Sequence, residues 1–426
     1  MLYRVETGLH AHLTDTQGRK TAMHLEKALG LHVAAIRQIK VYTVDGLTAE
    51  QAARLVAEGI WHDPILQCAA LEPLPVTQPA DWFVEVGFRP GVTDNEGRTA
   101  RDTAAMVLGV SRESLRVYTS VQYRIANDAA APLSREQVEG LARDLLCNTL
   151  IQRFRVKSAE EWAAEPGFAA QAAQVTGEAS SAVDTIRLSG MDDAALQKAS
   201  RDNTWALTLE EMHCIRDQFS GVEECRRRAA LGLPEGDPTD VEMEVLAQTW
   251  SEHCKHKIFA SRIDYENRET GRREDVDNLY KTCIRDATAQ LRARMGERDY
   301  CKSVFKDNAG VISFINGYDA CIKVETHNSP SALDPYGGAL TGIVGVNRDP
   351  MGTGMGAELV CNTDVFCFAS PFYDKPLPPR LLHPRRVLEG VREGVEHGGN
   401  KSGVPTVNGS LVFDERYLGK PLVYCG

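Results

Sequence analysis

The chain has 426 residues, which is too long for one ordinary domain and predicts about two to four. Apolar residues make up 43% and charged residues 25%, a composition typical of a soluble globular protein. The formal net charge of −11 argues against a nucleic-acid-binding face, because phosphate contacts require clustered Lys and Arg side chains. A local basic pocket for a phosphorylated small molecule is compatible with this charge.

The N-terminal stretch MLYRVETGLHAHL lacks the basic and long apolar regions of a secretory signal. No apolar run approaches the roughly 20 residues needed to cross a bilayer. The eleven cysteines form no CxxC pair, and an odd number cannot all pair within the chain. We therefore expect a cytoplasmic protein with reduced thiols and no membrane partner.

An internal repeat opens the chain. LTDTQGR at 13–19 returns as VTDNEGR at 92–98, so Asp15 corresponds to Asp94 with an offset of 79 residues. Each copy predicts strand, turn, helix, strand, helix, strand, with helices at about 19–30 and 99–109 that end at a glycine. In the turn, Gly is interpreted as accepting a positive φ. We predict that residues 3–80 and 82–157 share one topology and pair into one layer, which is more typical of a scaffold than of a catalytic site.

Residues 159–236 have a different composition, rich in Ala, Gln, Gly and Ser before a predicted helix at Leu209–Phe219. This segment is interpreted as a partly helical linker that drapes over its neighbours. A capping box at Thr239 then opens a predicted helix over 241–259, with Leu246, Trp250 and His253 along one face. A histidine packed in this way is more often part of a core than of a site. A zinc site at His253, Cys254 and His256 is a weak alternative, because adjacent helical positions point in different directions.

The densest chemistry follows a predicted strand at 320–324. Strand alternation places Lys323, Glu325 and His327 on one face, before Pro330 ends the strand. Two glycine-rich stretches, 336–349 and 398–409, are interpreted as loops whose backbone N–H groups approach phosphate, although tight turns are the alternative. Neither stretch matches a Walker or dinucleotide-binding pattern. Arg348 and Asp349 would supply a phosphate partner and an oxygen ligand for a hard metal.

Four motifs carry a resemblance to a known family: AQTWSEHCKHK at 247–257, KVETHNSPS at 323–331, GGALTGIVGVNRD at 337–349 and GVPTVNG at 403–409. Together they resemble phosphoribosylformylglycinamidine synthase, and the N-terminal repeats resemble two copies of its small subunit. The resemblance implies an α+β fold with a duplicated small-subunit-like α/β layer, a linker, and the N-terminal half of an aminoimidazole ribonucleotide synthetase-like domain. The implied boundaries are 1–80 and 81–158 for the repeats, 159–236 for the linker and 237–426 for the synthetase-like part.

The resemblance also implies roles for individual residues. Its catalytic positions are His253 and the proton acceptor His327, its ATP-binding positions are His256 and Lys323, its magnesium ligands are Glu325 and Asp349, and its substrate-binding positions are Thr326, Asn328, Ser329 and Arg348. Many relatives have a second histidine where this chain has Ser329, and a hydroxyl would give a substrate contact of different geometry. We predict that the two carboxylates lie about 5 Å apart or less, within reach of one cation.

The implied reaction is the ATP- and Mg²⁺-dependent conversion of formylglycinamide ribonucleotide to formylglycinamidine ribonucleotide, with ammonia from a glutaminase subunit or domain. The last residues, PLVYCG at 421–426, form a predicted apolar strand without a cap. We therefore expect this chain to be an N-terminal fragment whose partner is the C-terminal remainder of the synthetase. Alone, the fragment should be inactive and should have an exposed sheet edge at Leu422–Tyr424. A non-catalytic assembly module and another ATP-dependent member of the same superfamily are the alternatives.

Overall fold

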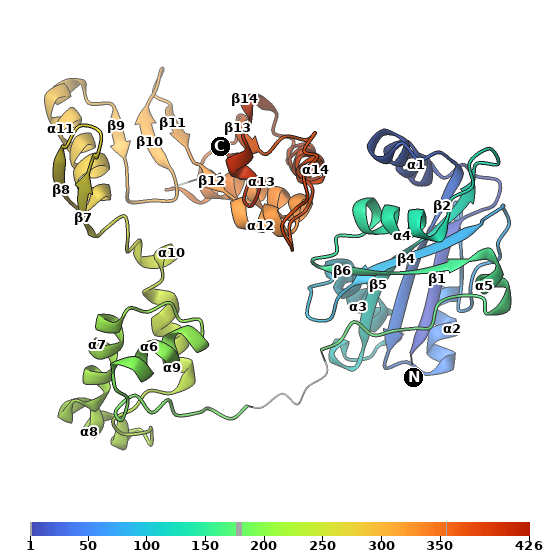
Figure 1. Ribbon diagram of the computed structural model, residues 1–426, viewed down its shortest axis with the longest axis horizontal. Coiled ribbons are helices and arrows are strands. Elements are labelled where there is room, and N and C mark those ends of the chain that lie inside the picture. The colour runs from blue at the N-terminus through green and yellow to red at the C-terminus, as the bar shows by residue number, and fades with distance from the viewer. Residues whose placement is uncertain (1, 176–180, 355) are drawn as a thin grey trace. The chain divides into compact units, whose positions relative to one another are not determined.

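The computed structural model describes residues 2–175, 181–354 and 356–426. The chain forms two compact units, one made of Met1–Thr176 with Ile322–Gly426 and the other of Gly177–Cys321 (Figure 1). Both units mix helices with strands, as the predicted α+β class requires. No helix in the described parts of the chain is long and apolar enough to cross a membrane.

The two N-terminal repeats have the same order of elements. The first contains β1 (Tyr3–Leu9), α1 (Thr16–Leu29), β2 (Val33–Asp45), α2 (Ala49–Ala57) and β3 (Gln67–Ala70), and the second contains β4 (Trp82–Phe88), α3 (Asn95–Leu108), β5 (Arg116–Asn127), α4 (Arg135–Leu141) and β6 (Gln152–Ser158). They share one six-stranded sheet of order β3-β1-β2-β5-β4-β6, in which β2 and β5 are antiparallel neighbours. Within each repeat the first strand lies between the other two, so the prediction of a shared topology is confirmed.

The repeated TDxxGR motif starts a helix. Asp15 and Asp94 are the N-caps of α1 and α3, and each accepts a hydrogen bond of 2.7 Å from the N–H of Gly18 or Gly97. A Cβ at Gly18 would lie 1.9 Å from the carbonyl oxygen of Ile36, so only glycine lets the helix start so close to the next strand. The predicted positive φ at this glycine is wrong, because both glycines lie within the helices. The predicted C-terminal glycines are confirmed, since both helices end at a glycine in the left-handed conformation.

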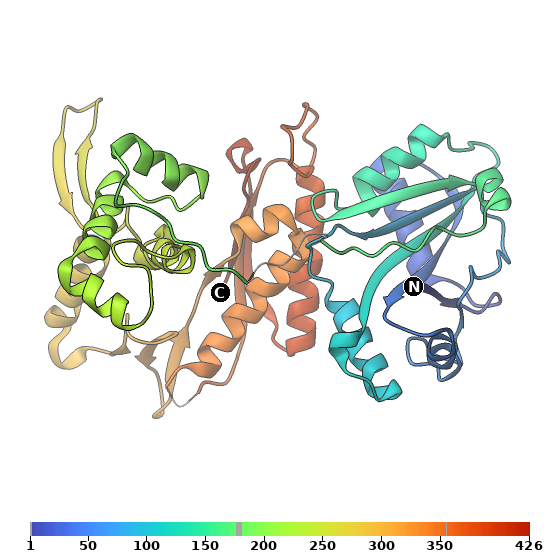
Figure 2. The same cartoon turned by 90° about the horizontal axis from the view of Figure 1, so that it is seen from below.

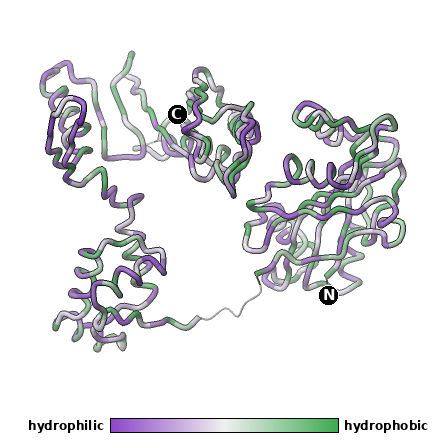
Figure 3. The backbone as a smooth tube through the Cα atoms, in the orientation of Figure 1, coloured by the Kyte–Doolittle hydropathy of each residue, from purple (hydrophilic) through white to green (hydrophobic). Residues whose placement is uncertain are grey.

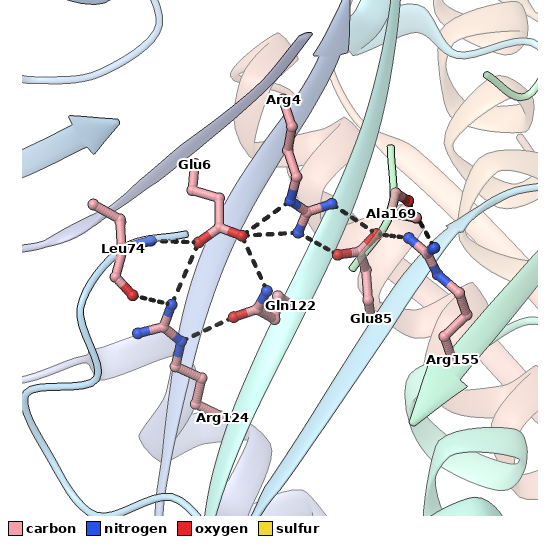
Figure 4. Close-up of polar contacts among 8 residues, drawn as sticks. All are labelled: Arg4, Glu6, Leu74, Glu85, Gln122, Arg124, Arg155 and Ala169. Carbon is pink, nitrogen blue, oxygen red and sulfur yellow. Dashed lines mark hydrogen bonds and ion pairs between the residues drawn. The ribbon is translucent and has the colours of Figure 1, made fainter. Parts of the chain in front are cut away.

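One face of this sheet packs against the helices, whereas the other carries a network of buried charges (Figure 4). Glu6 is fully buried and pairs with Arg4 at 2.9 Å and with Arg124 at 3.3 Å. Arg4 also reaches Glu85 on β4, which pairs with Arg155 at 2.7 Å. Because β1, β4, β5 and β6 all contribute, the network joins the two repeats into one body.

The second unit begins with helices. Its elements are α6 (Asp193–Asp202), α7 (Leu209–Ser220), α8 (Val222–Ala230), α9 (Asp240–Thr249), α10 (Glu252–Lys255), β7 (Arg262–Glu266), β8 (Arg273–Asp277), α11 (Asp286–Met295), β9 (Cys301–Ser303), β10 (Gly310–Ser313) and β11 (Asp319–Ile322). The predicted helix at Leu209–Phe219 is confirmed as α7. Leu196, Met212, Ile215 and Met243 share a buried core, so this region is a small helical domain more than a loose linker. The turn between β10 and β11 is apolar and exposed, as the green of Figure 3 shows.

The remainder of the first unit contains α5 (Ala159–Ala164), β12 (Glu325–Thr326), α12 (Asn328–Leu333), α13 (Pro335–Gly352), β13 (Asn362–Phe368), α14 (Pro384–Ser402), β14 (Thr406–Phe413) and β15 (Leu422–Cys425). The last four strands form a sheet of order β12-β15-β13-β14. The predicted exposed edge at Leu422–Tyr424 is therefore wrong. β15 pairs with β12 on one side and β13 on the other, and the edges are β12 and β14.

The first glycine-rich stretch, 336–349, lies entirely within α13, so its interpretation as a phosphate-binding loop is wrong. The second, 398–409, is divided among the end of α14, a short connection that begins at Gly403 and the start of β14. Helices α13 and α14 lie side by side (Figure 2), and glycines set their separation. A Cβ at Gly394 would lie 2.5 Å from the carbonyl oxygen of Tyr336, and one at Gly398 would lie 2.9 Å from Ile343 Cγ2. Glycine lowers helix propensity by about 1 kcal/mol per residue, and the close packing that it permits offsets that cost.

Candidate functional site

The predicted alternation around β12 is confirmed. Lys323, Glu325 and His327 are half-buried, whereas Val324 and Thr326 between them are exposed. β12 pairs with β15 through Glu325 and Thr326, and the N–H of His327 extends this pairing to the carbonyl of Val423 at 2.9 Å. The sheet thereby aims three different ionisable groups toward α13.

Two carboxylates converge on one ammonium group. Lys323 Nζ lies 3.4 Å from Glu325 Oε1 and 3.2 Å from Asp349 Oδ2, although Asp349 comes from α13. Burial lowers the pKa of Lys323, but the hydrogen bond and charge of Asp349, together with Glu325, hold that pKa above its usual value. The lysine is therefore a cation at neutral pH, and both carboxylates can reach a single positive charge.

Glycines of α13 make room for this face of the strand. A Cβ at Gly345 would lie 3.7 Å from Glu325 Cγ and 4.0 Å from His327 Nε2, and one at Gly342 would lie 3.5 Å from His327 Cβ. The imidazole thus packs along the helix. Its Nδ1 is buried without a hydrogen-bond partner among the described residues.

A buried polar row lies beside these residues, and the sequence analysis did not identify it. Cys425 on β15 is the cross-strand neighbour of both Glu325 and Asp364. Burial, and then the charges of Asp364 and Glu325, raise the pKa of the Cys425 thiol to about 12. Burial also raises the pKa of Asp364, although Thr406 donates a hydrogen bond of 3.1 Å to it. The available signal was a lone carboxylate inside the apolar strand NTDVFCF at 362–368.

The predicted substrate-binding residues differ in their freedom to bind a ligand. Asn328 Oδ1 accepts a hydrogen bond of 2.8 Å from the N–H of Val423, so this oxygen already holds β15. Its amide nitrogen is the part that could bind a ligand. Thr326, Ser329 and Arg348 are exposed.

His253 and His256 belong to the second unit. The predicted helix over 241–259 is wrong, because α9 ends at Thr249 and Ser251 starts the separate short helix α10. The predicted packing of His253 against apolar side chains is also wrong, since that histidine is exposed. His256 follows α10 in the left-handed conformation, with φ of 53°. Within residues 241–259, the side chains that pack in or against the helical core are those of Met243, Leu246, Ala247 and Trp250.

The geometry can be tested against a magnesium ion. No group of three or more His, Cys, Asp or Glu residues suited to a metal ion occurs in residues 2–175, 181–354 and 356–426. Mg²⁺ is, however, commonly bound through one or two carboxylates, with water and phosphate oxygens completing an octahedron. Glu325 and Asp349 already share one cation, so this pair fits such an ion.

Three family models match separate parts of the chain. Residues 82–160 match phosphoribosylformylglycinamidine (FGAM) synthase, residues 196–257 match the formylglycinamide ribonucleotide amidotransferase linker domain, and residues 306–426 match the N-terminal domain of AIR synthase related proteins. Curated relatives agree with these matches. This chain is 34% identical over 244 residues to the PurL subunit of phosphoribosylformylglycinamidine synthase from Thermoplasma volcanium. It is 35% identical over 242 residues to the same subunit from Thermoplasma acidophilum. In these parts the chain is similar to proteins of the phosphoribosylformylglycinamidine synthase family.

These matches to the FGAM synthase family cover 57% of this chain but only 26% of each Thermoplasma relative, so the chain spans about a quarter of their length. The PurL subunit of Rhodococcus erythropolis is 33% identical over 53% of this chain and 24% of its own length. A solved structure titled T. maritima PurL complexed with ADP is 28% identical, with a TM-score of 0.29, over 47% of this chain and 25% of that one. That TM-score is too low to support an inference about the fold or the site.

Proposed function

We propose that the chain contributes an ATP- and substrate-binding part of an enzyme that converts formylglycinamide ribonucleotide to formylglycinamidine ribonucleotide. The observation that carries the proposal is the convergence of Glu325 and Asp349 on Lys323, beside the half-buried His327. These residues lie in the motifs KVETHNSPS and GGALTGIVGVNRD, which also carry the resemblance to the family.

The proposed chemistry begins with a poor leaving group. The amide oxygen of the substrate must be phosphorylated by ATP before ammonia can displace it. Glu325 and Asp349 would hold Mg²⁺, which would neutralise phosphate charge when bound. Lys323 would then turn from the carboxylates to a phosphate oxygen, since an ammonium group serves equally well as a partner for that anion.

Other residues would orient the substrate and move protons. His327 would take a proton from the attacking ammonia, because a ring nitrogen of a neutral imidazole can accept a proton. The amide nitrogen of Asn328, the hydroxyls of Thr326 and Ser329 and the guanidinium of Arg348 would bind the substrate. His253 and His256 would serve as the active-site histidine and an ATP contact, the roles that the resemblance implies for them.

The reaction also defines the partners in the proposal. Ammonia would come from a glutaminase subunit or domain, and the portion of the synthetase that this chain does not match in its relatives would complete the site. Catalysis requires reacting groups within fractions of an ångström, and charge stabilisation weakens in water. We therefore expect the 426-residue chain alone to form no amidine product at an enzymatic rate.

The test supplies ATP, magnesium, ammonia and formylglycinamide ribonucleotide, so that no glutaminase is needed. The chain is assayed alone and with the portion of a Thermoplasma relative that lies beyond the match. Product only in the mixture, lost in His327→Ala and His253→Ala and retained in the control His24→Ala, is the expected result. Turnover on the order of 1 s⁻¹ by the chain alone would refute the shared site, and no product under any condition would refute the function.

A further inference from the structure

Both repeats contact the synthetase-like part of the same unit through side chains that reach backbone carbonyls. Arg385 donates to the carbonyl of Ala28 at 3.3 Å, and Arg386 donates to that of Arg143 at 3.2 Å. Leu150 packs against the core formed by α13, α14 and their sheet. One further contact of this kind reaches α12, the helix that directly follows His327.

Asn148 makes that contact. This residue is 7% exposed, and its Nδ2 donates a hydrogen bond of 2.8 Å to the carbonyl of Leu333, the last residue of α12. Its own conformation is held from three directions. Its Oδ1 accepts from the N–H of Leu150 at 3.2 Å, its N–H donates to Gln152 Oε1 at 2.8 Å, and its carbonyl accepts from the N–H of Ile151 at 3.1 Å. The donor that faces Leu333 is therefore preorganised.

Helix α12 depends on such outside contacts. It has six residues and no side-chain cap at its start, and an isolated helix of this length is unstable in water. Asn328 anchors its first turn to Val423, whereas Asn148 anchors its last residue. Between them, a Cβ at Gly338 of α13 would lie 2.4 Å from the N of Ser331, so the helix sits closely on α13. A shift at Leu333 would move Asn328 and His327 with it.

We propose that Asn148 is a positioning residue, which fixes α12 from the second repeat and thereby places His327 and Asn328 for the substrate. The role of Asn148 in substrate binding rests on the proposed function, whereas its role in fixing α12 does not. The repeats would then contribute to substrate binding without touching the substrate, because a small misplacement of a binding group costs affinity and rate.

The test compares Asn148→Asp with a matched control, Lys20→Met, in the 426-residue chain. The aspartate keeps the acceptor for Leu150 but replaces the donor to Leu333 with a second acceptor. The control breaks Lys20–Glu393, an ion pair of 3.0 Å between the first repeat and α14 that does not involve α12. Asn148→Ala is the second variant, which removes the donor without adding a charge.

The first measurement is amide hydrogen exchange, which does not depend on any ligand. We expect exchange at Ser331 and Asp334, whose N–H groups bond within and at the end of α12, to become about tenfold faster in both Asn148 variants and to stay unchanged in Lys20→Met. Unchanged exchange in α12 would overturn the proposal. An equal rise across α13 and α14 would also overturn it, since that would indicate loss of docking.

The second measurement is calorimetric binding of formylglycinamide ribonucleotide and, separately, of a non-hydrolysable ATP analogue with magnesium. We expect about tenfold weaker substrate binding by Asn148→Asp, with unchanged binding of the analogue. Equal losses for both ligands, or none for the substrate, would overturn the positioning role. If the substrate binds neither to the unmodified chain nor to its mixture with the Thermoplasma portion, the proposed function fails, and the exchange measurement still decides whether Asn148 fixes α12.

Discussion

Lys323 occupies the position where Glu325 and Asp349 would hold a metal ion, so removing its charge should strengthen metal binding. In Lys323→Met, two ion pairs of 3.4 Å and 3.2 Å are lost from side chains that are 28%, 31% and 21% exposed. Pairs in such partly exposed positions contribute about 0.2–1 kcal/mol each, and they must be broken before Mg²⁺ can bind. For two pairs, about 0.4–2 kcal/mol corresponds to about two- to thirtyfold tighter binding.

The assay is a titration with Mn²⁺ followed by electron paramagnetic resonance, with Mg²⁺ as competitor and without nucleotide. Lys302→Met is the matched control, because Lys302 also pairs with a carboxylate, at 2.6 Å from Asp319, and neither residue is a proposed metal ligand. We expect a change only in Lys323→Met. Unchanged or weaker binding in that variant would refute the interpretation of the two carboxylates as a cation site masked by the lysine.

Three further predictions concern packing and ionisation. Gly394→Ala should lower the free energy of unfolding by about 1–2 kcal/mol in denaturant titrations, because its Cβ would meet a backbone oxygen at 2.5 Å. The control Gly419→Ala should leave that free energy unchanged, because no atom lies within 4 Å of its Cβ. Equal effects of the two substitutions would contradict the packing argument. Burial raises the pKa of Asp364, so the folded chain loses stability as pH rises from about 3.9 through the pKa of the folded state. Asp364→Asn should therefore raise the free energy of unfolding by about 1 kcal/mol at pH 7 but not at pH 3. A gain that is independent of pH would contradict a raised pKa. Cys425, whose thiol pKa is raised to about 12, should resist iodoacetamide at pH 8 in the folded chain while the exposed Cys254 reacts, as mass spectrometry would show; alkylation of both at one rate would be inconsistent with this burial.

Local signals were sufficient for the N-terminal repeats. The duplicated TDxxGR motif indicated the repeat, and glycines ended both helices where predicted. Capping depends on residues three or four apart, so a short stretch of sequence contains all of its partners. The strand alternation of Lys323, Glu325 and His327 was predictable for the same reason.

Nonlocal packing decided the elements that were predicted wrongly. The glycines of 336–349 predict loops when helix propensity is considered alone, yet they lie in α13 because β12 and α14 approach its backbone. The break at Trp250 likewise exposes His253, which an uninterrupted helix would have packed. Propensity is worth about 1 kcal/mol per residue, and the burial of a closely packed helix exceeds it.

By itself, the sequence determined the resemblance to the synthase family, the duplicated topology and the residues that carry the candidate chemistry, since motifs and periodicity are properties of consecutive residues. Only the tertiary structure showed that Asp349 and Glu325 share one ammonium group, that Cys425 lies between Glu325 and Asp364, and that Asn148 holds the end of α12. The physical reason is distance along the chain. Asn148 and Leu333 are separated by 185 residues. Their hydrogen bond exists only after the two segments have packed together, so the conformational preferences of neighbouring residues cannot predict it.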